Sequence, residues 1–257
     1  MPTALALHEY RNWLTRYRRT WKGTLVISVL NPLLFLIAVG LGIGQLVDPA
    51  TSGMGGVSYL AFFAPGMLAA AAMQNGIVES GFGVSWATRS DGSYTTAKAT
   101  PLEPADILGG HLLYMASKLA LSAGCFLLVM IAIGAAQSPT VVLALPAAVL
   151  LGLAFATPTA AWAVTLSGPS KVGAAFKWVV MPLYLFSGTF FAVELMPTWL
   201  QWLAYATPLW HGVDLCRSLS LGTATWANSA IHLAYLVTLT VAGGLIALRL
   251  YRRHLHP

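Results

Sequence analysis

The sequence has 257 residues, of which 57% are hydrophobic and only 9% charged, and its formal net charge is +6. Soluble domains carry about 25% charged residues, so these proportions exclude a globule exposed to water on all sides. They predict an integral membrane protein made of helices, because the period-two alternation of barrel strands is not visible. We interpret the basic excess as the mark of a cytoplasmic membrane face rather than of nucleic-acid binding.

Residues 1–22 predict an amphipathic helix that lies along the membrane surface. Aromatic residues recur at spacings of three and four on one face, and arginines occupy much of the rest, a pattern typical of interfacial helices. A basic flank without a fixed helix is the alternative, since charge alone would satisfy the topology rule. The residues that carry the pattern include Arg11, Trp13, Arg16, Tyr17 and Trp21.

Six apolar segments are each long enough to cross a bilayer as a helix, which takes about 20 residues. Together with their connections they form one transmembrane domain over residues 23–257. The expected spans are 23–47, 58–84, 107–136, 141–166, 172–192 and 229–250.

The lysines and arginines outside these spans alternate with each crossing. Five precede the first span and two lie in the loop 85–106, whereas the connections 48–57 and 137–140 contain none. Because basic residues favour the cytoplasmic side, we expect a multi-pass protein of the cell inner (plasma) membrane. Both termini and the loop 85–106 should face the cytoplasm.

The stretch 193–212 is apolar and aromatic, but Pro197 and Pro208 divide it into pieces too short to cross. Tryptophans such as Trp199 suit the bilayer interface, and Glu194 stands at its start. We expect two short re-entrant helices, meaning helices that enter the outer leaflet and return on the same side. The alternative, a seventh broken span, would place the basic C-terminus outside.

Polar side chains interrupt the second span at Gln74, Asn75 and Glu79. Ionisable groups within the membrane are costly and often functional, so these three could line a translocation path. They could equally bond a neighbouring helix and hold the bundle together. Lys118 in the third span is another deep charge, and its partner cannot be named from the sequence.

The loop after the second span contains a long polar run between predicted spans. Gly92 and Pro101 bracket a segment of about two helical turns, and Asp91 can cap its start. The pattern predicts a short cytoplasmic helix held between two spans, the alternative being a solvated connector. The residues expected to matter are Arg89, Asp91, Gly92, Ser93, Tyr94, Thr100 and Pro101.

Motifs for chemistry are missing from the sequence. Residues 168–173 have the glycine spacing of a nucleotide-binding loop, but Ala174 and Ala175 replace its Lys and Ser/Thr. The six histidines lack metal-site spacing, and a nucleophile–base constellation is absent. We therefore predict no catalytic residue, no metal and no cofactor on this chain, which argues against a membrane-embedded transferase or hydrolase.

Two stretches, 59–80 and 89–110, resemble the membrane subunit (permease) of type-2 ABC (ABC-2) exporters. The similarity is greatest to the branch that exports nodulation-type lipo-oligosaccharides and certain drugs. With the six-span plan, the resemblance extends over nearly the whole chain. The family pattern is matched by Arg89, Gly92-Ser93, Thr100-Pro101-Leu102, Asp106 and Leu108-Gly109.

This resemblance implies a homodimer in which each copy binds a separate cytoplasmic ABC ATPase subunit, two copies in all. That partner would hold ATP and Mg²⁺, so this chain would not be an enzyme by itself. The helix within 86–100 would be the coupling helix, the N-terminal helix the connecting helix, and 193–212 the re-entrant extracellular helices. The cargo would be amphipathic, either a lipid-linked saccharide (glycolipid) or a hydrophobic drug.

A carrier that acts alone is the alternative function. A proton-coupled efflux carrier needs a protonatable group on its pathway, and Glu79 is the only deep carboxylate that the predicted spans offer.

Overall fold

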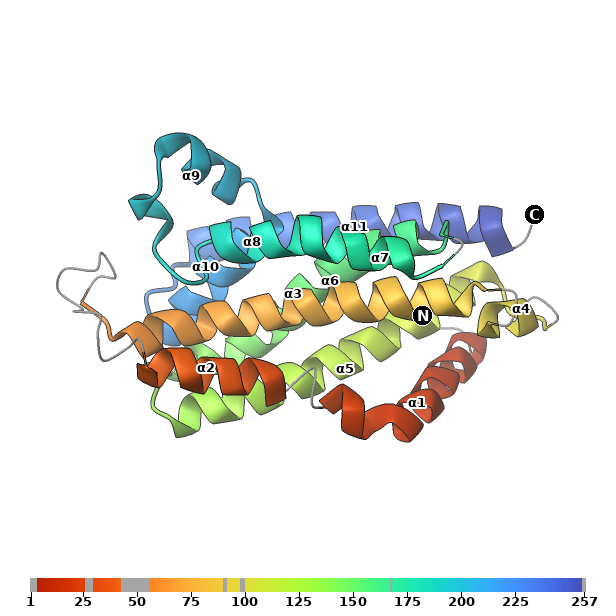
Figure 1. The fold of residues 1–257 in the computed structure, drawn as a ribbon, viewed down its shortest axis with the longest axis horizontal. Helices are drawn as coiled ribbons and strands as arrows, with labels where there is room; N and C mark the ends of the chain where they lie inside the picture. The colour runs from red at the N-terminus through yellow and green to blue at the C-terminus, as the bar shows by residue number, and fades with distance from the viewer. Residues whose placement is uncertain are drawn as a thin grey trace.

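The computed structural model describes residues 4–25, 30–42, 56–89, 92–97, 100–166 and 168–255. This part of the chain is helical, with turns between the helices and no strand (Figure 1). The elements are α1 Ala4–Leu25, α2 Asn31–Gly42, α3 Tyr59–Ala87, α4 Ser93–Ala97, α5 Pro104–Ala132, η3 Pro139–Leu143, α6 Ala144–Ala163, α7 Ser170–Ala175, η4 Phe176–Val180, α8 Met181–Phe186, η5 Val193–Leu195, α9 Thr198–Tyr205, α10 Pro208–Leu221 and α11 Trp226–Leu255.

Four helices in the described residues are long and apolar enough to cross a membrane: α3, α5, α11 and the combined η3–α6. The predicted first span, 23–47, lies partly outside the described residues, and α2 covers its middle. The predicted fifth span, 172–192, overlaps α7, η4 and α8, which end at Phe186. An all-helical membrane protein is thus confirmed, whereas the number of six spans stays a prediction.

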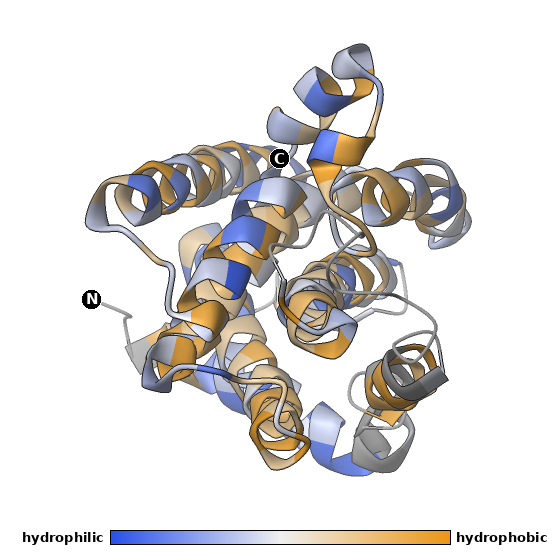
Figure 2. Ribbon diagram, turned by 90° about the vertical axis from the view of Figure 1, so that its left-hand side faces the viewer, coloured by the Kyte–Doolittle hydropathy of each residue, from blue (hydrophilic) through white to orange (hydrophobic). Residues whose placement is uncertain are grey.

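Helix α3 is the central helix of the bundle and packs against α2, α5, α6 and α10. Its residues 61–73 are buried at every position, as expected of a helix that is apolar on all sides. A Cβ at Gly76 would collide with the carbonyl of Gly152 in α6, so these glycines let the two backbones approach closely. The long helices run side by side in the end-on view (Figure 2).

A single helical turn of π type, η4, separates α7 from α8. Pro182 lies in the first turn of α8 and has no N–H to donate to the carbonyl of Trp178. The N–H of Met181 instead reaches the carbonyl of Phe176, five residues back. The resulting turn widens the helix locally.

Helices α9 and α10 fall in the stretch predicted to be re-entrant. Thr207 caps α10 by accepting a hydrogen bond from the Trp210 N–H at 3.3 Å. The helix continues beyond the predicted end at residue 212 and stops at Leu221, where Gly222 adopts a left-handed conformation with φ +75°.

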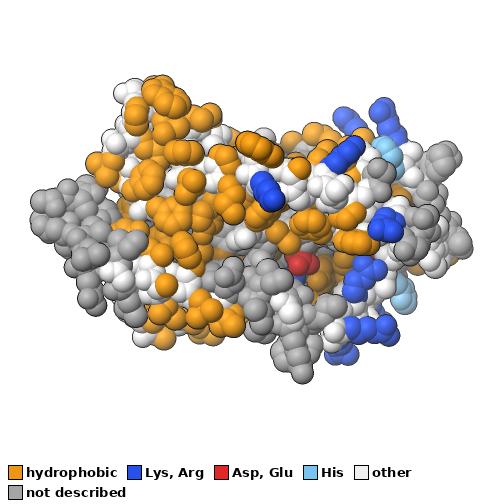
Figure 3. Space-filling view, in the orientation of Figure 1, with side chains coloured by type: hydrophobic (Ala, Val, Ile, Leu, Met, Phe, Trp, Pro, Cys, Tyr) orange, Lys and Arg blue, Asp and Glu red, His pale blue; other side chains and the backbone are white. Residues whose placement is uncertain are grey.

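Lysine and arginine side chains gather mainly at one end of the bundle, which we call the basic end (Figure 3). The short helix α4 and the C-terminal end of α11 lie there, whereas α9 and α10 lie at the opposite end (Figure 1). Hydrophobic side chains cover much of the visible face between the two ends (Figure 3).

Candidate functional site

The short helix α4 is held against the end of α3 by a tight turn at Gly92. The Gly92 N–H donates to the Arg89 carbonyl at 2.8 Å, and the Thr95 hydroxyl donates to the same oxygen at 2.9 Å. A Cβ at Gly92 would collide with the Ala87 carbonyl and lie 2.6 Å from that of Trp86. This position therefore has no room for a side chain.

Tyr94 points inward from α4 and is 1% exposed. Its ring meets Tyr251 of α11 edge to face, with centroids 5.9 Å apart, and the two hydroxyl oxygens lie 3.5 Å apart. Burial, with a smaller effect of Tyr251, raises the pKa of Tyr94 well above its usual value, so its hydroxyl stays protonated. Thr95 and Thr96 are exposed, and they form the outward surface of α4.

The segment after α4 turns directly into α5. The Thr100 hydroxyl donates to the Ala97 carbonyl at 2.7 Å, and Pro101 is exposed. The Glu103 N–H then donates to the Asp106 carboxylate at 3.2 Å, which fixes the first turn of α5. Of the residues predicted for this site, Arg89, Gly92, Ser93, Tyr94, Thr100 and Pro101 are described, and Asp91 lies outside the described residues.

Helix α1 lies against α5, at the basic end. Trp13 is 5% exposed; its ring stacks on Tyr114 at 5.5 Å and meets the edge of His111 at 4.7 Å. A Cβ at Gly110 would lie 2.7 Å from both the Ala6 carbonyl oxygen and the Glu9 Cβ. The aromatic face predicted for the membrane surface thus packs at least partly on protein.

The other aromatic and basic side chains of α1 also lie on different sides, with the aromatic ring on protein and the arginines exposed. Tyr17 meets Tyr114 edge to face at 6.3 Å, whereas Arg11 and Arg16 are exposed. The Arg16 guanidinium lies 5.2 Å from the Trp13 ring centroid. The side chain of Trp21 lies outside the described residues.

Helices α1 and α4 also border one open cavity of about 390 Å³. Burial raises the pKa of Glu9, a lining residue from α1, and its hydrogen bond to Asn12 opposes the shift. Helix α4 is thus enclosed by α1 on one side and by α11 on another. The cavity is lined by His8, Glu9, Asn12, Ser93, Thr96, Ala97, Thr100 and Leu102.

The three polar residues predicted on the second span do not form one strip. Asn75 donates to the Ser122 hydroxyl of α5 at 3.0 Å, and Glu79 forms an ion pair with Lys118 of α5. Gln74 instead lines a groove on another side of α3. Asn75 and Glu79 therefore join α3 to α5, whereas Gln74 faces the groove.

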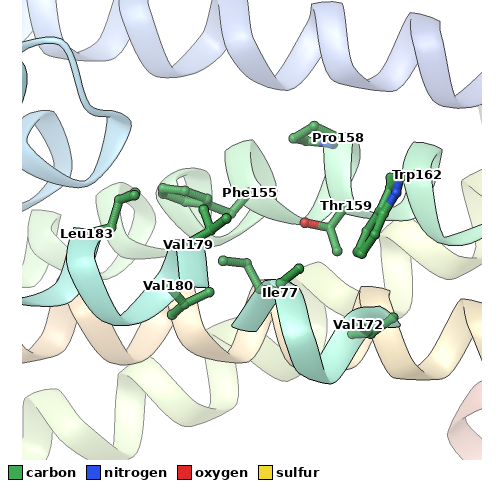
Figure 4. A pocket seen from close by; sticks show the side chains of 10 residues that line it. Ile77, Phe155, Pro158, Thr159, Trp162, Val172, Val179, Val180 and Leu183 are labelled. Carbon is green, nitrogen blue, oxygen red and sulfur yellow. The ribbon is translucent and has the colours of Figure 1, made fainter. Parts of the chain in front are cut away.

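Two apolar grooves flank the helix formed by α7, η4 and α8. The α6 groove has a volume of about 400 Å³ and lies between this helix and α6 (Figure 4). The α2 groove, about 330 Å³, lies on the side of α2 and includes Gln74. The α6 groove is lined by Ile77, Phe155, Pro158, Thr159, Trp162, Val172, Ala175, Val179, Val180 and Leu183, and the α2 groove by Phe35, Met67, Gln74, Phe176, Val180, Met181, Tyr184, Leu185 and Phe190.

The two prolines predicted to divide the re-entrant stretch mark the starts of its helices. Pro197 immediately precedes α9 and Pro208 opens α10. Trp199 is 70% exposed on α9. Glu194 is also exposed, and its carbonyl accepts a hydrogen bond from the Gln201 side chain at 3.2 Å.

A cluster that the sequence analysis missed joins α10 to α11 at the end opposite the basic end. The Nδ1 atoms of His211 and His232 lie 2.8 Å apart, and His232 Nε2 lies 3.0 Å from the Asp214 carboxylate. The ring of Tyr235 stacks on His211 at 4.0 Å. The polar residues of this cluster are visible in the sequence on either side of the turn between α10 and α11. No rule of sequence spacing pairs them.

Arg217 of α10 forms a second group of contacts that the sequence analysis did not predict. Its guanidinium donates to the carbonyls of Phe62 at 3.1 Å and Gly188 at 2.7 Å. It also lies 3.7 Å from the Phe62 ring centroid. The residue therefore ties α10 to α3 and to the turn after α8.

Comparison with known proteins adds the family. The family model of the ABC-2 type transporter matches residues 7–221. Nodulation protein J of Rhizobium leguminosarum bv. viciae is 31% identical over 253 residues, which cover 95% of each chain. That of Rhizobium meliloti (strain 1021) is 30% identical over 96% of this chain and 95% of its own.

A drug-resistance protein is similar as well. The daunorubicin resistance ABC transporter permease protein DrrB1 of Streptomyces coeruleorubidus is 27% identical over 89% of this chain and 79% of its own. These matches, together with the four apolar helices long enough to span a membrane, confirm the resemblance drawn from residues 59–80 and 89–110. The chain belongs to the ABC-2 type transporter family and is a membrane-embedded permease.

Proposed function

We propose that this chain is the permease subunit of an ATP-driven exporter, energised by a separate cytoplasmic ATPase. Helix α4 carries this proposal. It is a short helix between two long apolar helices, it exposes Thr95 and Thr96, and its other side is anchored by Tyr94. A surface helix held in this way can receive a push from a partner and pass it to the bundle.

Orientation follows from the basic end. Because lysines and arginines favour the cytoplasmic side of a membrane, α4 and the end of α11 would face the cytoplasm (Figure 3). With six spans, both termini would lie on this side of the inner (plasma) membrane. Helices α9 and α10 would then be the re-entrant helices of the outer side.

In this arrangement α4 is the coupling helix and sits in a groove of the ATPase, which holds ATP and Mg²⁺. Helix α1 is the connecting helix along the inner membrane face. Its packing on α5 and the cavity that it shares with α4 support this role, because movement of α4 changes the space next to α1.

A homodimer is the assembly that we propose. The helix formed by α7, η4 and α8 exposes large apolar side chains, among them Trp178, Met181 and Leu185. It has a groove on each side, so a second copy could pack against it. Two ATPase subunits would serve the two copies.

The α2 groove supports our proposal for the class of cargo. Its lining is apolar apart from the Gln74 amide and the Tyr184 hydroxyl, and the Tyr184 hydroxyl already donates to the Met67 sulfur at 2.8 Å. Such a surface suits an amphipathic molecule with an apolar body and a few polar groups. We propose a lipid-linked saccharide or a hydrophobic drug, moved out of the cytoplasm or the inner leaflet.

The test is co-purification and reconstitution with an ABC ATPase of the same cell. We expect a stable complex whose ATPase activity rises with an amphipathic substrate and falls when α4 is disrupted. Gradient-driven transport by this chain without an ATPase would instead favour a proton-coupled carrier.

A further inference from the structure

Helix α11 runs the length of the molecule from the outer helices to the basic end (Figure 1). It has 30 residues, so at 1.5 Å per residue it is about 45 Å long. It contains no proline, and its helical backbone is continuous from Trp226 to Leu255. Such a helix can transmit displacement from one end to the other if a different element packs against each end.

At the basic end, α11 contacts the short helix α4 through a pair of buried side chains. Tyr251 is 0% exposed and meets Tyr94 of α4 edge to face, as described above. Leu255, one turn further on, also borders a cavity of about 240 Å³ together with Tyr94 and Thr95. Displacement of α4 therefore acts directly on the last two turns of α11.

At the opposite end, α11 contacts both α9 and α10. His232 faces His211 of α10, and the Tyr235 hydroxyl donates to the Ala206 carbonyl at the end of α9 at 2.8 Å. One hydrogen must lie between the two facing Nδ1 atoms, so one histidine donates and the other accepts. Asp214 accepts from the other nitrogen of His232 and orients its ring.

Between its ends, α11 packs along α6, and at Gly243 this contact leaves no room for a side chain. A Cβ at Gly243 would lie 2.8 Å from Pro158 Cδ and 2.5 Å from the Thr157 hydroxyl, closer than real Cβ atoms approach. The neighbouring Gly244 has open space around it. The contact with α6 is thus confined to one side of α11 and can act as a pivot.

We propose that α11 is a rigid connector that couples movement of α4 to the outer helices α9 and α10, with Tyr251 and His232 as positioning residues and Gly243 as the pivot. This inference rests on the proposed function, because α4 moves only if an ATPase acts on it. It adds a route by which that movement reaches the outer side of the membrane. The proposal requires that a change at one end of α11 alters the other end; the position of α11 between the two sites is not sufficient.

The experiment uses the complete complex of this chain and its ATPase in nanodiscs. Cys125 and Cys216 are replaced by alanine, and Thr198→Cys on the exposed start of α9 serves as the reporter. Its reaction rate with a membrane-impermeant maleimide is measured without nucleotide and with a non-hydrolysable ATP analogue. We expect the rate to change by at least about fivefold, the lower range for coupled sites.

Tyr251→Leu and His232→Leu are each expected to abolish this change, and the double variant should be no worse than either single one. Tyr251→Phe keeps the ring contact and should retain most of the change. Leu245→Ala, at an exposed position on α11, is the matched control and should behave as the parent. A full change in both single variants, or losses that add in the double variant, would overturn the connector.

Gly243→Ala and Gly244→Ala give a second test that leaves both end contacts intact. Gly243→Ala forces α11 and α6 apart and should weaken the response, whereas Gly244→Ala should preserve it. If Gly244→Ala alone removed the response, α11 would act as a hinge and the rigid connector would be wrong. If the complex showed substrate-stimulated ATPase activity but the reporter did not respond to nucleotide, the connector would be wrong and the proposed function would stand. If no complex with an ATPase formed, the proposed function would fail first, and with it the connector.

Discussion

The Glu79–Lys118 pair places two opposite charges between α3 and α5. Lys118 is 6% exposed, and the cost of burying its charge is offset mainly by the Glu79 carboxylate beside it. Its Nζ also lies 5.6 Å from the Tyr17 ring centroid. Because the two charges compensate each other, we interpret Glu79 as a residue that holds α3 to α5 rather than as one that lines a translocation path.

A charge-removal cycle tests this interpretation. Glu79→Gln should destabilise the purified protein by about 3 kcal/mol, because the buried Lys118 charge loses its counter-ion. Lys118→Met should cost less, since Glu79 is partly exposed, and the double variant should recover much of the loss. Thermal unfolding in detergent measures all three; a double variant as unstable as the sum of the single ones would contradict the pairing.

Two adjacent glycines of α5 offer a matched pair at the contact with α1. Gly110→Ala should weaken the packing of α1 by about 1–3 kcal/mol, the usual cost of overpacking, because α1 backbone and side-chain atoms occupy the space. Gly109→Ala has only a normal contact, 3.8 Å from Ala6 Cβ, and should leave it unchanged. Limited proteolysis within α1 reports the difference, and equal protection in both variants would count against the docking.

The position of helix α4 depends on the tight turn at Gly92. Gly92→Ala should lower transport and substrate-stimulated ATPase activity by about tenfold, which corresponds to about 1.4 kcal/mol, because its Cβ would push α4 away from the end of α3. Arg89→Ala should act in the same direction. Membrane insertion should remain normal, as judged by yield and gel filtration.

Leu245→Ala is the control, because this side chain is exposed on α11 away from α4 and can shrink without moving the short helix. Unchanged transport in a chain with both Arg89 and Gly92 altered would remove the coupling assignment.

The sequence predicted the elements better than their contacts. Helices α5 and α11 and most of α3 and α6 coincide with long apolar runs, and Pro197 and Pro208 mark the short helices. The rotation of each helix about its axis was not predictable, because a helix such as α3 is apolar on all sides and has no distinct face. Gln74, Asn75 and Glu79 were therefore grouped together, whereas Asn75 and Glu79 face α5 and Gln74 faces the α2 groove.

Contacts between distant segments were hidden for a related reason. Tyr94 and Tyr251 are 157 residues apart, and the pairing of His211 with His232 depends on how α11 returns beside α10. No local periodicity encodes such pairs. The sequence did predict the short helix between Gly92 and Pro101, because the glycine and proline that bound it are local signals.

At the scale of the whole molecule, the exposed apolar helix formed by α7, η4 and α8 predicts the dimer interface. In a chain without its native cysteines, single cysteines at Trp178, Met181 and Leu185 should allow a bifunctional maleimide to cross-link two copies at one or more of these positions. Trp226→Cys, at an even more exposed residue on α11, should not cross-link. Cross-linking through residue 226 alone would place the interface elsewhere.

Transport in proteoliposomes tests the central claim most directly, since energy should enter through a partner and not through this chain. A fluorescent lipid-linked oligosaccharide is followed across the membrane with this chain alone, with its ATPase alone and with both, in the presence of ATP or of a pH gradient. We predict ATP-dependent transport only when both subunits are present, and its loss in Gly92→Ala. Transport by this chain alone under a pH gradient, with no gain from the ATPase and ATP, would contradict the account.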